Sequence, residues 1–178
     1  MLGFHDESGI SEKPTVRRTW AVKGQTPVIQ SSGSWTNLSL MGTLICDCEG
    51  EKAKLFLKSR IGSVKAPNVV LYLKELKRHL WGKKLLLFWD GLPAHRAKRV
   101  QIFLEENKSK FKVVRFPAYA PELNPIEYFW AALKSKDLCN LEPQLSTIRQ
   151  SVRKGYHRIK SQQNLLKGFL KASKLFSY

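Results

Sequence analysis

The chain has few acidic residues, and none of its 14 aspartates and glutamates lies beyond Glu142. Lysine and arginine together number 31, so the formal net charge of the 178-residue chain is +17. An excess of this size favours a polyanionic partner, most often a nucleic acid and less often an anionic membrane surface. The last 36 residues carry eight basic residues and a helical apolar stripe, which predicts a folded segment with one basic face.

Cysteine is also scarce, with three residues in the chain. An odd number without a framework of spacings argues against a disulfide scaffold and for a reducing compartment. Cys46 and Cys48 are expected on one face of a strand, but no second Cys or His pair stands at ligand spacing, so structural zinc is not expected. No apolar run approaches the roughly 20 residues that span a bilayer, and no signal-peptide pattern opens the chain. We therefore expect a cytoplasmic protein without a membrane partner.

The sequence further lacks internal repeats, low-complexity linkers and the nucleophile elbow of Ser/His/Asp hydrolases. Its length suits one domain with a sizeable core and is short for two. Residues 84–89 form a near-continuous apolar run, which is typical of a central strand covered on both faces. A helix over 94–107 and a strand over 111–116 follow, so strands 84–89 and 111–116 are expected to be parallel. Other strands are predicted at 2–6, 35–48 and 52–58, with a long polar excursion over 7–34 and a helix from 67 onward.

Three acidic residues share one physical context. Asp6 is expected to terminate the first strand, Asp90 follows the apolar strand 84–89, and Glu127 opens a later helix. Ligands of parallel sheets bind beyond the carboxyl ends of the strands, where these side chains can meet. Like charges repel at short range, so such a cluster in a basic protein calls for a cation, and carboxylate oxygens favour Mg²⁺ or Mn²⁺. Two ions roughly 4 Å apart would suit phosphodiester displacement.

Glu127 has a structural interpretation as well. Pro117, Pro121 and Pro125 recur every fourth residue and hold the preceding segment extended until a helix begins. Asn124 is predicted as the N-cap and Pro125 as the first helical residue, so Glu127 can close a capping box. The alternative is a carboxylate held for chemistry at the edge of an apolar helix face. That face is predicted to consist of Ile126, Phe129, Trp130 and Leu133.

Several other residues are candidates with two open interpretations each. Glu7 would point to the opposite side of the strand from Asp6, so we do not assign it to metal binding. His95 and Arg96 either pack on the loop after Asp90 or contact phosphate. The basic segment at 17–18 is either a solvated loop or lies against a phosphate backbone. The candidates for contact with DNA are Arg17, Arg18, His95, Arg96, Arg153, Lys154 and Arg158.

Four segments in this order resemble one known family: HDESG at 5–9, RRTW with GQTP at 17–27, WDGLPAHR at 89–96 and PELNPIE at 121–127. They are similar to the catalytic domain of bacterial insertion-sequence transposases of the branch related to mariner transposons, insertion-sequence family six-thirty. The resemblance implies a DDE triad at Asp6, Asp90 and Glu127. Thirty-six residues separate Asp90 from Glu127, a spacing typical of that branch.

The fold implied is an α/β, ribonuclease-H-like domain with a mixed five-stranded sheet in the order 3-2-1-4-5. Its second strand should run antiparallel to its neighbours, with helices on both faces. We expect this catalytic domain over residues 1–140, with basic helices of 141–178 packed on it. The implied chemistry is cleavage of DNA at transposon ends and strand transfer, usually at TA, with two Mg²⁺ ions or Mn²⁺ held by Asp6, Asp90 and Glu127.

The partners implied by the resemblance are transposon-end and target DNA in the bacterial nucleoid, a second copy of the chain in an active homodimer, and a separate helix-turn-helix domain or subunit. Two other functions stay open at this point. A ribonuclease-H-like nuclease would use the same triad and only hydrolyse nucleic acid. A catalytically silent DNA-binding protein would keep the basic surface alone.

Overall fold

The structure is a computed structural model that describes residues 1–12, 18, 20–25, 28, 37–117, 121–141 and 144–176. Its centre is a five-stranded sheet in the order β3-β2-β1-β4-β5, as predicted. The strands are β1 (Leu2–Ser11), β2 (Asn37–Cys46), β3 (Ala53–Ile61), β4 (Leu85–Trp89) and β5 (Phe111–Arg115). The helices are α1 (Ala66–His79), α2 (Pro93–Arg96), α3 (Lys98–Glu106), α4 (Ile126–Lys136), α5 (Leu145–Lys160) and α6 (Gln163–Ala172), with a 3-10 turn at Pro121–Leu123.

The strand directions confirm the mixed sheet. β2 is antiparallel to both β1 and β3, whereas β1, β4 and β5 run parallel to one another. The prediction that the first strand ends at Asp6 is wrong, because β1 continues to Ser11. The reason is its partner: β2 pairs with β1 along its whole length, while β4 pairs only with Leu2–Phe4. Asp6 therefore lies just beyond the part of β1 that β4 covers.

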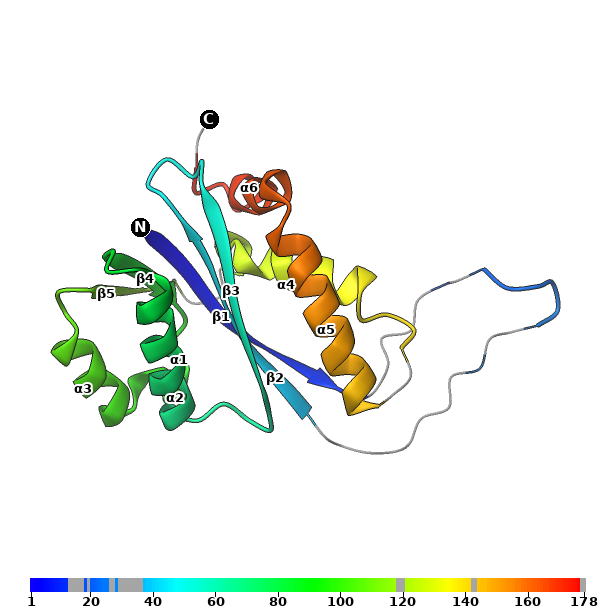
Figure 1. Ribbon diagram of the computed structural model, residues 1–178, viewed down its shortest axis with the longest axis horizontal. Coiled ribbons are helices and arrows are strands. Elements are labelled where there is room, and N and C mark those ends of the chain that lie inside the picture. The colour runs from blue at the N-terminus through cyan, green and yellow to red at the C-terminus, as the bar shows by residue number, and fades with distance from the viewer. Residues whose placement is uncertain are drawn as a thin grey trace.

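Helices cover both faces of the sheet (Figure 1). On one face, α1 and α3 pack on side chains such as Ile45 and Leu87. On the other, α4, α5 and α6 pack on Leu40 and Leu44. The two cores alternate along β2, since successive side chains of a strand point to opposite faces. No helix in the described part of the chain is long and apolar enough to cross a membrane.

The predicted helix over 94–107 is instead two helices, α2 and α3. The chain is extended at Ala97, with φ −62° and ψ 140°, which interrupts the helical hydrogen bonds. The two pieces have different partners: α2 is held at His95 by side chains of the sheet, whereas Val100 and Phe103 of α3 are buried in the core with α1. Because of this break, the short helix α2 stands close to the end of β4 and is separate from α3.

The C-terminal segment completes the core on the α4 face. Ile148, Val152 and Ile159 of α5 are buried there, as are Leu166 and Leu170 of α6. The predicted apolar stripe of this region is therefore buried against the sheet and α4. The division of the chain at residue 140 stays a prediction.

Candidate active site

The end of β4 sets the position of two aspartates. Phe4 of β1 pairs with Phe88 of β4, and the two rings stack with centroids 5.3 Å apart. Asp6 and Asp90 each follow this pair by two residues, one along β1 and one just after the end of β4. The end of β4 thus places both carboxylates at the edge of the sheet where ligands of parallel strands bind.

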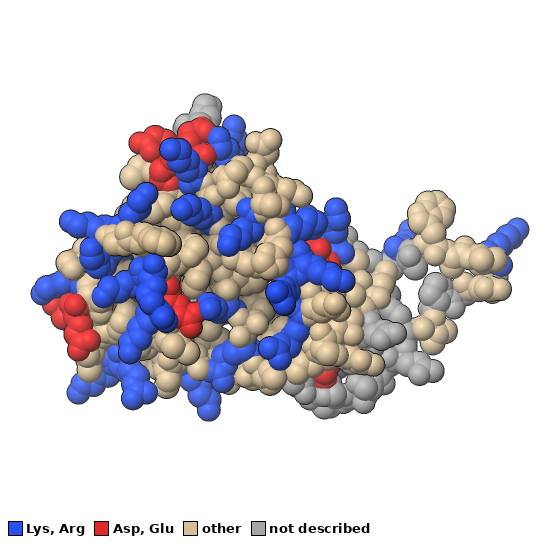
Figure 2. Space-filling model, viewed as in Figure 1, with Lys and Arg blue, Asp and Glu red and all other residues tan. Residues whose placement is uncertain are grey.

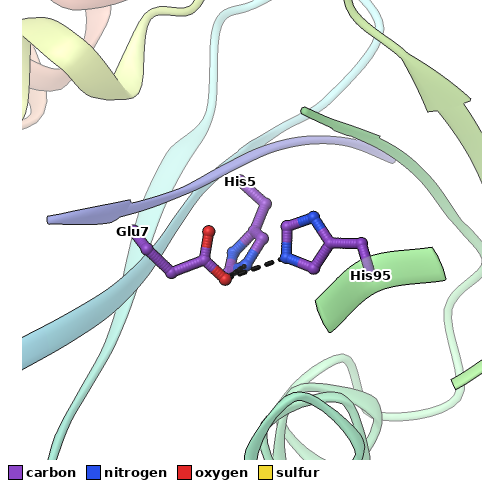
Figure 3. A group of neighbouring side chains, drawn as sticks. All are labelled: His5, Glu7 and His95. Carbon is purple, nitrogen blue, oxygen red and sulfur yellow. Dashed lines mark hydrogen bonds and ion pairs between the residues drawn. The ribbon is translucent and has the colours of Figure 1, made fainter. Parts of the chain in front are cut away.

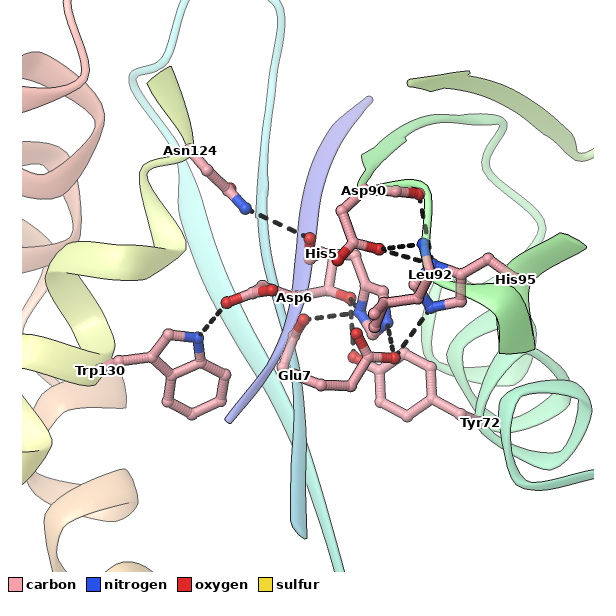
Figure 4. A network of polar contacts seen from close by, with 11 residues as sticks. His5, Asp6, Glu7, Tyr72, Asp90, Leu92, His95, Asn124 and Trp130 are labelled. Carbon is pink, nitrogen blue, oxygen red and sulfur yellow. Dashed lines mark hydrogen bonds and ion pairs between the residues drawn. The ribbon is translucent and has the colours of Figure 1, made fainter. Parts of the chain in front are cut away.

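Asp6 points toward α4 (Figure 4). The indole Nε1–H of Trp130 donates a hydrogen bond to Asp6 Oδ2 at 2.9 Å. Burial and the nearby negative charge of Glu127 raise the pKa of Asp6 from its usual 3.8 to about 7, although the hydrogen bond from Trp130 acts in the opposite direction. The start of α4 therefore brings a second carboxylate within electrostatic reach of Asp6.

The start of α4 differs from the prediction. The helix begins at Ile126 after Pro125, and Asn124 does not cap it. Asn124 is buried and donates from Nδ2 to the backbone carbonyl of His5 at 3.3 Å, which ties the loop to β1 beside Asp6. No side-chain hydrogen bond caps this end of α4 within the described residues, so the capping-box interpretation of Glu127 is wrong. Glu127 remains available for another role.

Asp90 uses one carboxylate oxygen for its own loop. Its Oδ1 accepts a hydrogen bond from the backbone N–H of Leu92 at 3.0 Å and lies 2.9 Å from His95 Nδ1. The side chain is 43% exposed, in contrast to the buried His95. Asp90 is thus held from the protein side and is open to solvent on the other.

A polar cluster of His5, Glu7 and His95 (Figure 3) lies on the opposite face of β1 from Asp6 (Figure 4). Glu7 Oε1 lies 3.2 Å from His5 Nε2 and 2.9 Å from His95 Nε2. Burial alone would raise the pKa of Glu7, but the two histidines hold it well below its usual range. Burial would likewise lower the pKa of His95, but Asp90 and Glu7 raise it to about 9.

Sequence reasoning placed Glu7 on the correct side of β1 but missed this cluster. The available signal was the alternation of His5 and Glu7 around Asp6, together with a histidine five positions after Asp90. His95 is 2% exposed and both its ring nitrogens face carboxylates. Of its two interpretations, the structure favours packing against the loop.

The remaining DNA-contact candidates that the structure describes differ in exposure. Arg17 lies outside the described residues, and Arg18 is exposed. Figure 2 shows lysine and arginine over one face of the molecule, with few acidic residues between them. Arg153 and Lys154 of α5 are exposed, whereas Arg158 is paired with Asp137 at 2.6 Å.

The raised pKa of Asp6 gives a prediction for stability. In buffer free of divalent ions, Asp6→Asn is expected to increase the free energy of unfolding at pH 8 by on the order of 2–4 kcal/mol. The pKa of Asp6 is about 7 in the folded protein, against the usual 3.8. Protonation of Asp6 therefore stabilises the folded state fully below pH 3.8, and this stabilisation is lost as the pH rises through 7. The Asn side chain has no such proton to lose.

Urea unfolding of both proteins at pH 4 and pH 8 measures this effect. The difference in unfolding free energy between the wild type and Asp6→Asn reports on Asp6, because the two proteins share every other titrating group. A stability difference that does not grow between pH 4 and pH 8 would contradict the electrostatic arrangement around Asp6.

The fold defines the class of the protein. The sheet order and the helices on both faces are those of a ribonuclease-H-like domain. The chain belongs to the DDE superfamily endonuclease family, whose sequence profile matches residues 1–148. The family is one of enzymes that act on phosphodiester bonds.

Individual relatives agree with this assignment. The chain is 27% identical over 163 residues to the insertion element IS630 uncharacterized 39 kDa protein of Shigella sonnei, covering 86% of this chain and 43% of that protein. It is also similar to the Mos1 strand transfer complex, with a TM-score of 0.69 and 20% identity over 97% of this chain and 52% of that one. For the Mos1 mariner paired end complex with Mg, the TM-score is 0.61 at 16% identity, covering 99% and 56%. These structural likenesses concern the fold, and the chain spans about half the length of these relatives.

Proposed function

We propose that this chain is the catalytic domain of a transposase, which cleaves DNA at transposon ends and transfers the strand into target DNA. One arrangement carries the proposal: Asp6 and Asp90 each follow the paired residues Phe4 and Phe88 by two positions, and the charge of Glu127 contributes to the raised pKa of the buried Asp6. Membership of the DDE superfamily endonuclease family supports it. Asp6, Asp90 and Glu127 are the proposed catalytic residues.

The donors of this site fit a divalent cation. Burial and the charge of Glu127 penalise a second negative charge at Asp6, and a bound cation would remove that penalty. Oxygen donors alone favour Mg²⁺ or Mn²⁺ over zinc. We propose two such ions, which when bound activate a water or 3′-hydroxyl and stabilise the leaving oxygen. Mos1 mariner paired end complexes with Mn and with Mg have a similar fold, which supports this choice.

Each of the three proposed ligands, Asp6, Asp90 and Glu127, would present a carboxylate oxygen to the ions. Asp6 Oδ2 accepts a hydrogen bond from the indole N–H of Trp130, and Oδ1 is the oxygen proposed to face an ion. Asp90 Oδ1 is held by Leu92 and His95, which leaves Oδ2. Glu127, on the first turn of α4, would close the site from the side opposite β4. These roles are holding and orienting, since none of the three needs to become a nucleophile.

The substrate proposed for this site is double-stranded DNA. A net charge of +17 supplies long-range attraction to phosphate, and the exposed Arg153 and Lys154 are proposed contacts. Strand transfer at TA, an active homodimer and a helix-turn-helix domain or subunit that reads the transposon ends belong to the same proposal. One structure of similar fold is the Mos1 transposase paired-end complex with left transposon end, which supports DNA as the partner.

A strand-transfer assay tests the proposal. The purified chain is incubated with a pre-cleaved duplex from the DNA flanking its own gene, which ends in a 3′-hydroxyl, and with a supercoiled target plasmid. With Mg²⁺ or Mn²⁺ we expect joined products, and none with EDTA.

The other outcomes discriminate between functions. Metal-dependent nicking of the plasmid without joining would favour a nuclease that only hydrolyses. DNA binding without any metal-dependent product would favour a silent DNA-binding protein. Sequencing the joined products tests insertion at TA.

A further inference from the structure

His95 lies between two carboxylates that belong to different parts of the chain. Its Nδ1 is 2.9 Å from Asp90 Oδ1, and its Nε2 is 2.9 Å from Glu7 Oε1 (Figure 4). Ionised carboxylates only accept hydrogen bonds, so each ring nitrogen donates to its partner. The imidazole therefore joins the loop after β4 to the reverse face of β1.

The ring of His95 has little freedom to turn. It stacks on the indole of Trp89, with centroids 4.2 Å apart and planes 2° from parallel, and it is 2% exposed. Stacking fixes the plane of the imidazole, and the two hydrogen bonds fix its rotation within that plane. Because the imidazole of His95 is held in this way, its hydrogen bond also fixes the orientation of the Asp90 carboxylate.

Glu7 is anchored in turn to the middle of the sheet. The same Oε1 contacts His5 Nε2, and His5 Nδ1 donates to the carbonyl of Gly42 at 2.7 Å. Thr43, next in β2, is 2.7 Å from the hydroxyl of the buried Tyr72 of α1. The support behind His95 is therefore a network of buried hydrogen bonds rather than a flexible surface pair.

We propose that His95 is a positioning residue that holds Asp90 with its free oxygen toward the metal site, and that Glu7 acts through His95. The inference rests on the proposed function, in which Asp90 holds a divalent ion. His95 and Glu7 touch neither the ion nor the DNA. They lie on the face of β1 opposite Asp6, and the hydrogen bond from His95 Nδ1 to Asp90 Oδ1 is their direct contact with a proposed metal ligand.

His5, Glu7 and His95 could also be zinc ligands. Each offers one ligand atom, and these three atoms lie within 4.8 Å of one another. Two observations favour hydrogen bonding. Both Nε2 atoms contact the same oxygen at 2.9 and 3.2 Å, which are hydrogen-bond distances. The other nitrogen of His95 already faces Asp90.

The experiment measures Mn²⁺ binding to the full chain by the loss of the free-ion electron paramagnetic resonance signal. His95→Ala is expected to raise the dissociation constant about 10- to 100-fold, the size of effect typical of residues that orient metal ligands. Nicking by His95→Ala should recover as Mn²⁺ is increased, because the lesion is in affinity. His157→Ala on the exposed side of α5 is the matched control and should bind Mn²⁺ as the wild type does.

Two further variants keep the result interpretable. Glu7→Gln preserves volume and an acceptor for His95 but loses the charge, so a smaller rise in the dissociation constant is expected even if His95→Ala folds poorly. Asp90→Asn, measured in parallel, reports on the proposed function itself. If Asp90→Asn weakens Mn²⁺ binding while His95→Ala and Glu7→Gln do not, the positioning role is overturned and the function stands.

If Asp90→Asn leaves both binding and nicking unchanged, the proposed function fails as well. Stoichiometric zinc in the purified protein, lost in His5→Ala, would overturn the hydrogen-bonded assignment of the cluster. Circular dichroism of each variant shows whether the fold is kept.

Discussion

Asp90→Asn and Glu127→Gln are each expected to reduce metal-dependent nicking and strand transfer by roughly a thousandfold or more, a loss of about 4 kcal/mol in transition-state stabilisation. Each change keeps the shape of the side chain and removes one negative charge. In the proposed site that charge holds a divalent ion at the end of β4 or at the start of α4. DNA binding should stay the same or become tighter, because a negative charge is removed from a basic protein.

Glu105→Gln is the matched control for this loss. Glu105 lies on α3, is 72% exposed and pairs with Lys108, so the same change in charge occurs on the surface of α3. The measurement is initial rate of nicking under saturating Mg²⁺, with DNA affinity determined separately. Wild-type rates in both Asp90→Asn and Glu127→Gln would remove the basis of the proposed function.

Gly42→Ala is expected to lower the free energy of unfolding by about 1–3 kcal/mol and to reduce activity. Gly42 is the register partner of Asp6 on β2, and a Cβ there would lie 2.8 Å from Trp130 Cη2 and 2.9 Å from Ile126 Cδ1. Both belong to the buried face of α4, so the helix must shift or Trp130 must turn. Either movement loosens the hydrogen bond from Trp130 to Asp6.

Gly9→Ala provides the control for this substitution. Gly9 lies on β1 as Gly42 lies on β2, but a Cβ at Gly9 meets nothing within 4 Å. Its unfolding free energy should change by less than about 0.5 kcal/mol, as surface substitutions usually do. Equal stability of Gly42→Ala and Gly9→Ala in urea unfolding would show that α4 does not press on β2 as the structure has it.

The sequence alone determined the sheet and the order of its strands, because these follow from patterns that are local or characteristic of a family. The apolar run at 84–89 and the helix after Pro67 both predicted elements that the structure contains, and the resemblance to known transposases predicted the strand order. The side of β1 on which Glu7 lies was also predictable, because a strand alternates its faces with a period of two. Proposed catalytic residues could be chosen on the same basis.

Only the tertiary structure decided how the carboxylates are held. The sequence around Asp6 does not reveal where β1 ends, because the end depends on pairing with β2, where the partner of Ser11 is Asn37, 26 positions further along the chain. The local sequence predicts Asn124 as an N-cap. In the structure its side chain is buried against β1, where Nδ2 donates a hydrogen bond to the backbone carbonyl of His5. The contacts of Trp130 with Asp6 and of His95 with Glu7 join residues 124 and 88 positions apart, and no local pattern encodes such distances because packing sets them.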